Sequence, residues 1–245
     1  MKKAFSIFEL SIVILIIGLI SAGILTGNSL VKQARFKKLI DEYQQLNNSF
    51  INFQTKYNYF PGDYSEAYNQ WGSDCGTDGD VNNNAANCNG DGDYKIEWSG
   101  ESYRAWQHLE LGGFINGSYS GLAATSPNNF QLNSIQDGVF DRLVTGAGSS
   151  TNGIAADGGS NQPLFLMRNT NGNALLTTKE LYLFDKKFDD GLAYQGKIRN
   201  RFTDYTLCDG ANETASLIDV AADQYDLSNE NIICVPIFIL DNLLN

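Results

Sequence analysis

The first 57 residues constrain the fold of this chain more than any other segment. An apolar run extends from Phe5 to Leu25 and contains one charged residue, Glu9. A helix of this length spans about 30 Å, the thickness of the hydrocarbon core of a bilayer. A carboxylate in such a segment costs roughly 3 kcal/mol unless it has a partner, so Glu9 is a candidate functional residue.

The helical pattern continues beyond the apolar run. Large apolar residues recur at intervals of three and four: Phe36, Ile40, Tyr43, Leu46, Phe50, Phe53 and Tyr57. This spacing places them on one face of a helix, and Pro61-Gly62 ends it. We therefore predict a continuous helix from Phe5 to about Tyr57, roughly 80 Å long. Its first half is apolar all round, and its second half has one apolar stripe that a sheet can cover.

The N-terminal sequence resembles a known processing signal. The stretch Lys3-Ala4-Phe5-Ser6-Ile7-Phe8-Glu9-Leu10 is similar to the prepilin signal of type IV pilins and type II secretion pseudopilins. The resemblance implies a processing site at Lys3, Ala4 and Phe5, with Ala4 where the family usually has glycine. A membrane peptidase would cut before Phe5 and methylate the new amino terminus. Glu9 would then direct assembly by pairing with the amine of a neighbouring subunit.

Other segments carry a weaker resemblance to the same family. Tyr57-Asn58-Tyr59-Phe60-Pro61-Gly62-Asp63 resembles the end of the long helix in many pseudopilins, and Gly100 to Leu109 resembles a segment of prepilin-type proteins. The implied fold is α+β and pilin-like, with the long helix packed on an antiparallel sheet that carries long disulfide-closed loops. The implied organisation is a leader (1–4), a transmembrane or filament-core helix (5–25), an amphipathic helix (26–57) and a head (58–245).

Two other interpretations of the N-terminus remain open. Ser21-Ala22-Gly23 could serve as the cut site of an ordinary signal peptide. The chain would then be a secreted, disulfide-bonded binding or adhesion module. Alternatively, the apolar run could be a simple anchor of a membrane receptor that retains Met1.

The four cysteines, Cys75, Cys88, Cys208 and Cys234, indicate two disulfides in an oxidising compartment. Three connectivities are possible. We favour the local pairs Cys75–Cys88 and Cys208–Cys234, because each brackets a single loop or hairpin. Zinc is not expected, since the sequence lacks any C-x-x-C spacing.

The segment between the first two cysteines and just beyond is rich in Gly, Asn and Asp. Its carboxylates suggest a calcium site, because calcium prefers hard oxygen ligands in a flexible loop. The candidate ligands are Asp78, Asp80, Asp91 and Asp93. No frame fits the EF-hand template, so a solvated, disulfide-closed loop is the alternative.

Composition and motifs argue against other function classes. The formal net charge of −11 disfavours nucleic acid or an anionic membrane surface as the main partner, although Lys186, Lys187, Lys197, Arg199 and Arg201 form a small basic cluster. The chain has one histidine, His108, and lacks a P-loop, a G-x-G-x-x-G motif and a nucleophile elbow. We expect no enzymatic activity and no required cofactor.

Several elements of the head can be predicted from local patterns. Residues 96–114 read as a helix capped by Ser99 or Ser102, with Trp106 and Leu109 on one face. Residues 146–162 read as a surface loop, residues 163–168 as a buried strand, and residues 192–202 and 232–240 as further strands. Thr177 and Glu180 fit a capping box that opens a helix ending near residue 190.

Taken with the resemblance, these features predict a structural subunit, either a minor pilin or a pseudopilin. The implied partners are the prepilin peptidase and methyltransferase, other pilins or pseudopilins, and the inner-membrane platform with its assembly ATPase. The implied location is the bacterial inner membrane with a periplasmic head, followed by a pilus or pseudopilus.

Overall fold

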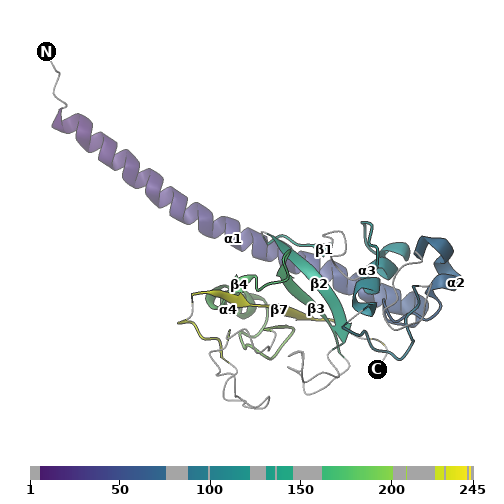
Figure 1. Ribbon diagram of the computed structural model, residues 1–245. Coiled ribbons are helices and arrows are strands. Elements are labelled where there is room, and N and C mark those ends of the chain that lie inside the picture. The colour runs from purple at the N-terminus through teal and green to yellow at the C-terminus, as the bar shows by residue number, and fades with distance from the viewer. Residues whose placement is uncertain are drawn as a thin grey trace.

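The computed structural model describes residues 6–75, 88–98, 100–121, 131–135, 137–145, 162–200, 208, 224–228, 230–241 and 243. The fold is α+β: one long helix, α1 (Ile7–Tyr57), projects from a head built of an antiparallel sheet and short helices (Figure 1). The shorter helical elements are α2 (Ala67–Trp71), η1 (Gly72–Cys75), α3 (Glu101–Leu111) and α4 (Thr178–Phe188).

Helix α1 begins and ends with capping residues that its sequence supplies. Ser6 is the N-cap, and its hydroxyl accepts a hydrogen bond from the Phe8 N–H at 3.2 Å. Asn58 ends the helix in the left-handed conformation, with φ of 58°, a geometry that Asn tolerates better than most residues. The predicted continuous helix is confirmed from Ile7 to Tyr57, while Phe5 lies outside the described residues.

The main sheet has five strands in the order β1-β2-β3-β7-β5, and each neighbouring pair is antiparallel. A second, two-stranded sheet joins β4 and β6. The strands are β1 (Gln131–Leu132), β2 (Gly138–Thr145), β3 (Pro163–Asn169), β4 (Leu176–Thr177), β5 (Ile198–Asn200), β6 (Ile232–Cys234) and β7 (Pro236–Ile239).

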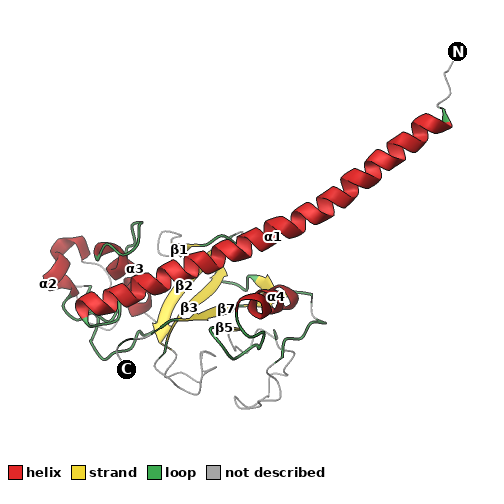
Figure 2. Cartoon of the chain, turned by 180° about the vertical axis from the view of Figure 1, so that it is seen from behind, coloured by secondary structure: helices red, strands yellow, loops and turns green. Residues whose placement is uncertain are grey.

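The core lies between the second half of α1 and one face of the main sheet (Figure 2). The predicted stripe on α1 is confirmed: Phe36, Tyr43, Leu46, Phe50 and Phe53 are buried, Ile40 and Tyr57 are half-buried, and Leu39 joins them. Phe238 of β7 occupies the centre, with its ring centroid 5.1 Å from that of Tyr43. The middle of the second half of α1 therefore packs on the sheet, and its last turns, at Phe53, pack on Trp71 and His108.

The structure corrects three predictions for the head. Gly100, not Ser102, is the N-cap of α3, and Ser99 lies outside the described residues. Strand β2 was not predicted. The predicted strand 192–202 is shorter than expected. Among its described residues, only Ile198–Asn200 pair with another strand, because the chain turns and bends between residues 191 and 197. The predicted strand 232–240 is divided at Val235, where the chain passes from one sheet to the other.

The remaining predictions hold where the structure describes them. Both local disulfides form, Cys75–Cys88 and Cys208–Cys234. Thr177 and Glu180 make the predicted capping box at the start of α4, and β3 is buried as predicted. The predicted loop 146–162 lies outside the described residues except at position 162.

Candidate functional site

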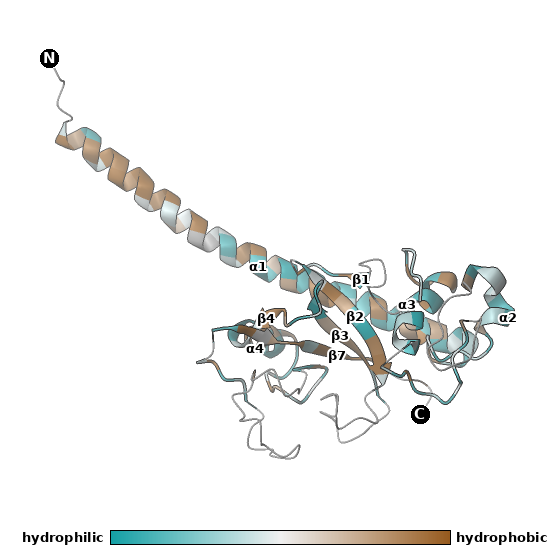
Figure 3. Ribbon diagram, viewed as in Figure 1, coloured by the Kyte–Doolittle hydropathy of each residue, from teal (hydrophilic) through white to brown (hydrophobic). Residues whose placement is uncertain are grey.

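The first half of α1 projects from the head with its apolar side chains exposed. By length and composition it could cross a membrane, and none of its most apolar 18-residue window is buried. Exposed residues include Ile7 (88%) and Leu19 (67%). Figure 3 shows this half as a hydrophobic rod that becomes hydrophilic where it meets the head. An exposed apolar helix of this length could serve as a membrane anchor or as a signal sequence.

Glu9 lies in the first turn of this rod. Its Oε2 accepts a hydrogen bond from the Ser6 backbone N–H at 2.9 Å, which completes a capping box. A carboxylate here is favoured by the positive end of the helix dipole, and helical side chains lean toward the N-terminus. Glu9 is therefore directed toward the position where the chain enters the helix. The processing residues Lys3, Ala4 and Phe5 lie outside the described residues.

Where α1 enters the head, a polar and an apolar contact fix its direction. Lys32 Nζ lies 2.5 Å from Glu180 Oε1 of α4, and the rings of Phe36 and Phe184 are 5.1 Å apart. Glu180 also accepts a hydrogen bond from the Thr177 N–H within its capping box. Because the same carboxylate caps α4 and binds Lys32, α4 is held against the base of the projecting rod.

An acidic loop lies near the far end of α1. Asp63 is fully buried and accepts hydrogen bonds from the backbone N–H groups of Gly92, Asp93 and Tyr94. Burial raises the pKa of Asp63 to about 7, although these donors act in the opposite direction. Gly90 approaches the Asp63 backbone so closely that a Cβ at position 90 would collide with it. The Asp63 carboxylate thus organises the loop from beneath.

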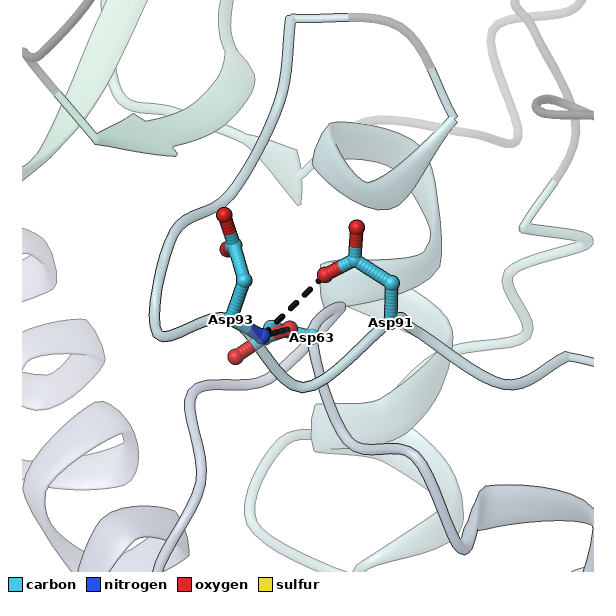
Figure 4. A group of neighbouring side chains, drawn as sticks. All are labelled: Asp63, Asp91 and Asp93. Atoms are coloured by element: carbon cyan, nitrogen blue, oxygen red, sulfur yellow. Dashed lines mark hydrogen bonds between the residues drawn. The ribbon is translucent and has the colours of Figure 1, made fainter.

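Two of the predicted calcium ligands lie beside Asp63. Figure 4 shows Asp91 and Asp93 pointing to the same side, with Asp63 below the loop, and carboxylate oxygens of the three residues lie within 4.8 Å of one another. These groups already accept internal donors: Asp91 Oδ1 takes the Asp93 N–H, and Asp93 Oδ2 pairs with Lys95 at 2.5 Å. These internal partners account for the positions of the three carboxylates.

The calcium hypothesis therefore stays a prediction, and internal hydrogen bonds explain the fold of the loop without a cation. The other two predicted ligands, Asp78 and Asp80, lie outside the described residues.

A second carboxylate, Glu101, supports the same loop from α3. It is 3% exposed, and its two oxygens accept the backbone N–H groups of Asp91 and Glu97 at 3.0 and 3.2 Å. Burial, and next a hydrogen bond with the Glu97 carboxyl, raise the pKa of Glu101 to about 10. Glu101 thus holds the loop to α3 through both of its oxygens.

His108 is a structural residue that joins two loops. Its Nδ1 accepts the Gly62 N–H and its Nε2 donates to the Cys88 carbonyl, both at 2.9 Å, which fixes the neutral Nε2–H tautomer. The ring is fully buried and stacks on Phe53. Desolvation lowers the pKa of His108 to about 3. Both ring nitrogens are therefore occupied by hydrogen bonds to the backbone.

Sequence reasoning missed the roles of Asp63 and Glu101, which lie outside the Gly/Asn/Asp-rich loop that they support. A signal was present for Asp63, since it closes the Pro61-Gly62-Asp63 sequence after the long helix. Gly62 adopts a φ of +95°, and a Cβ there would collide with the Glu101 carbonyl oxygen. The turn therefore requires glycine next to the organising carboxylate.

Comparisons with known proteins add no identity: no protein-family model, curated protein or solved structure matches this chain significantly.

Proposed function

We propose that this chain is a structural subunit, a minor pilin or pseudopilin, of a type IV pilus or a type II secretion-like filament. The observation that carries the proposal is the single 51-residue helix α1. One half of α1 is exposed and apolar, and the other half forms the core of an α+β head. Such a subunit can be held in a bilayer first and in a bundle of identical helices later.

Glu9 supplies a reason for ordered assembly in this proposal. A carboxylate in an apolar bundle needs a partner, and cleavage before Phe5 would create an amine four residues away in the sequence. Pairing of Glu9 with the amine of a neighbouring copy cancels both charges and sets the axial rise from one subunit to the next in the filament. A head-to-tail contact that does not close into a ring produces an open helical filament.

The length of the apolar run favours this proposal over an ordinary signal peptide. The run from Phe5 to Leu25 is longer than the apolar centre of roughly 7–15 residues that signal peptides have. The two disulfides are consistent with a head outside the cytoplasm. The proposed partners are prepilin peptidase, sister pilins, and the membrane platform with its ATPase.

The test is intact mass and N-terminal peptide mapping of the protein from its native host, with and without prepilin peptidase. We expect a mature N-terminus at methylated Phe5 that depends on the peptidase. A start near Ile24 would overturn the proposal in favour of a secreted binding module. A start at Met1 in both strains would identify a simple membrane anchor.

A further inference from the structure

Exposed cations lie on α1 and on the neighbouring helix α4, where α1 enters the head. We define the basic collar as these residues of α1 and α4: Lys32, Arg35, Lys37, Lys38, Lys179, Lys186 and Lys187. All seven are exposed. Residues 10–40 of α1 contain no Asp or Glu, although the whole chain has a net charge of −11. A local surplus of positive charge on an acidic protein indicates a specific anionic partner.

The fold brings the two halves of the collar together from distant parts of the sequence. The Lys32–Glu180 ion pair and the contact between Phe36 and Phe184 hold α4 beside α1, as Figures 1 and 2 show. The two carboxylates of α4 have partners within the protein. Glu180 pairs with Lys32, and the buried Asp185 accepts hydrogen bonds from Tyr225 and Gly191. On α1, Lys38 also pairs with Glu42 at 3.6 Å. The outward positive charge of the collar therefore comes mainly from Arg35, Lys37, Lys179, Lys186 and Lys187.

The position and shape of the collar identify the partner. Lys32 lies about 10 Å along the helix axis from the end of the apolar run, and Lys38 about 20 Å. At 100° per residue, Lys32, Arg35, Lys37 and Lys38 point in four different directions around the axis. A ring of charge around a helix suits a planar surface that the helix pierces, whereas a rod-like partner would contact one side only.

We propose that the basic collar binds the headgroups of anionic phospholipids and thereby seats the head on the membrane. This inference rests on the membrane-embedded helix of the proposed function, but not on cleavage or filament assembly. Clusters of Lys and Arg next to a membrane-spanning helix attract anionic lipids within a Debye length of the surface. The collar's place directly after the apolar rod favours this partner over duplex DNA or an acidic surface of a second copy.

The test uses the full chain in phosphatidylcholine vesicles that contain a trace of spin-labelled lipid. Electron paramagnetic resonance compares how much phosphatidylglycerol and phosphatidylcholine the protein immobilises. We expect about a fivefold preference for phosphatidylglycerol, which corresponds to one headgroup beside one cation. The preference should fall toward one at high salt, since exposed charges are screened.

A fourfold variant and a matched control locate the effect. Replacing Arg35, Lys37, Lys186 and Lys187 with Gln should abolish the preference, while the same change at the exposed control cation Lys56, at the other end of α1, should leave it. Lys32 is retained because it binds Glu180. Thermal unfolding verifies that both variants fold, and the salt dependence of the unmodified protein tests the proposal if either does not.

The outcomes separate the collar from the proposed function. A chain that does not float with the vesicles overturns the membrane-embedded helix and, with it, both proposals. A chain that floats without preferring phosphatidylglycerol, or a collar variant that keeps the preference, overturns the collar proposal alone. The collar proposal is also overturned if the collar variant keeps its lipid preference but loses cross-linking to a second copy or binding to duplex DNA. Either result would identify that other molecule as the partner of the collar.

Discussion

The buried histidine should make the stability of the head depend on pH in a characteristic way. His108 has a pKa of about 3 in the folded protein because burial disfavours the imidazolium, and about 6.5 when the chain unfolds. Its contribution to stability is therefore fully present above pH 6.5 and is lost as the pH falls toward 3. Between pH 7.5 and pH 5.0 this single group should reduce the free energy of unfolding by about 2 kcal/mol.

The assay compares denaturant unfolding of the full chain with that of His108→Gln, in detergent and with the disulfides intact. The Gln variant keeps a donor for the Cys88 carbonyl but leaves the Gly62 N–H without its acceptor, so it should be less stable at pH 7.5 by about 1–3 kcal/mol. That difference should shrink by about 2 kcal/mol at pH 5.0, because the variant lacks the titrating group. Trp71, whose ring lies 5.3 Å from the imidazole, offers a fluorescence signal.

The histidine is the only one in the chain, which makes the comparison specific. Buried Asp63 and Asp185 have pKa values that desolvation raises to about 7 and about 6, so their contributions are lost as the pH rises and have the opposite sign. These carboxyl contributions are present in both the unmodified protein and the His108→Gln variant, so they cancel when the two free energies of unfolding are compared at the same pH. Stability curves that stay parallel from pH 7.5 to 5.0 would refute the assignment, as would an imidazole that titrates near pH 6.5 by NMR.

Other perturbations test the assembly helix, the core and the loops. Glu9→Ala should leave membrane insertion intact yet reduce incorporation into filaments in cells, and normal assembly would contradict the pairing role. Phe238→Ala should lower the free energy of unfolding by about 3–5 kcal/mol, because its buried ring fills the space between α1 and the sheet; a loss below 1 kcal/mol would mean that the core collapses around it. Replacing Cys75 and Cys88 together with Ala should cost about 3 kcal/mol in the same denaturation assay, and unchanged stability would contradict this role. EDTA should leave Tm unchanged, because internal donors satisfy Asp63; a drop of several degrees would reveal a resident cation.

Periodicity predicted α1 because one face repeats over many turns and no proline interrupts it. Sequence could not locate β2 in the same way. Asp141 and Arg142 fall in the middle of its apolar residues and disguise a buried strand. In the structure Arg168 donates to Asp141 at 2.7 Å, and the Arg142 guanidinium lies 4.1 Å from the ring centre of Trp98. These partners come from other elements, so no local pattern could reveal them.

The residues of the candidate site also fall into those that the sequence predicted and those that it did not. Glu9 stood out because a charge in an apolar run is conspicuous within a few residues. Asp63 did not, since the backbone donors that it binds, Gly92 and Tyr94, lie 29 and 31 residues later, and only the folded chain brings them together. The cysteine pairs were predictable because each closes a short segment. The α3 cap was not, because Gly100 begins the helix without a side-chain hydrogen bond.

The arrangement of α1 along the sheet has a mechanical consequence. The buried stripe from Phe36 to Phe53 lies parallel to the helix axis over about 25 Å. A pull on the projecting end loads all these contacts in shear at once, rather than peeling them apart one by one. Rupture then requires the whole interface to slip together, so the head should resist axial tension far better than a sideways force at the same point.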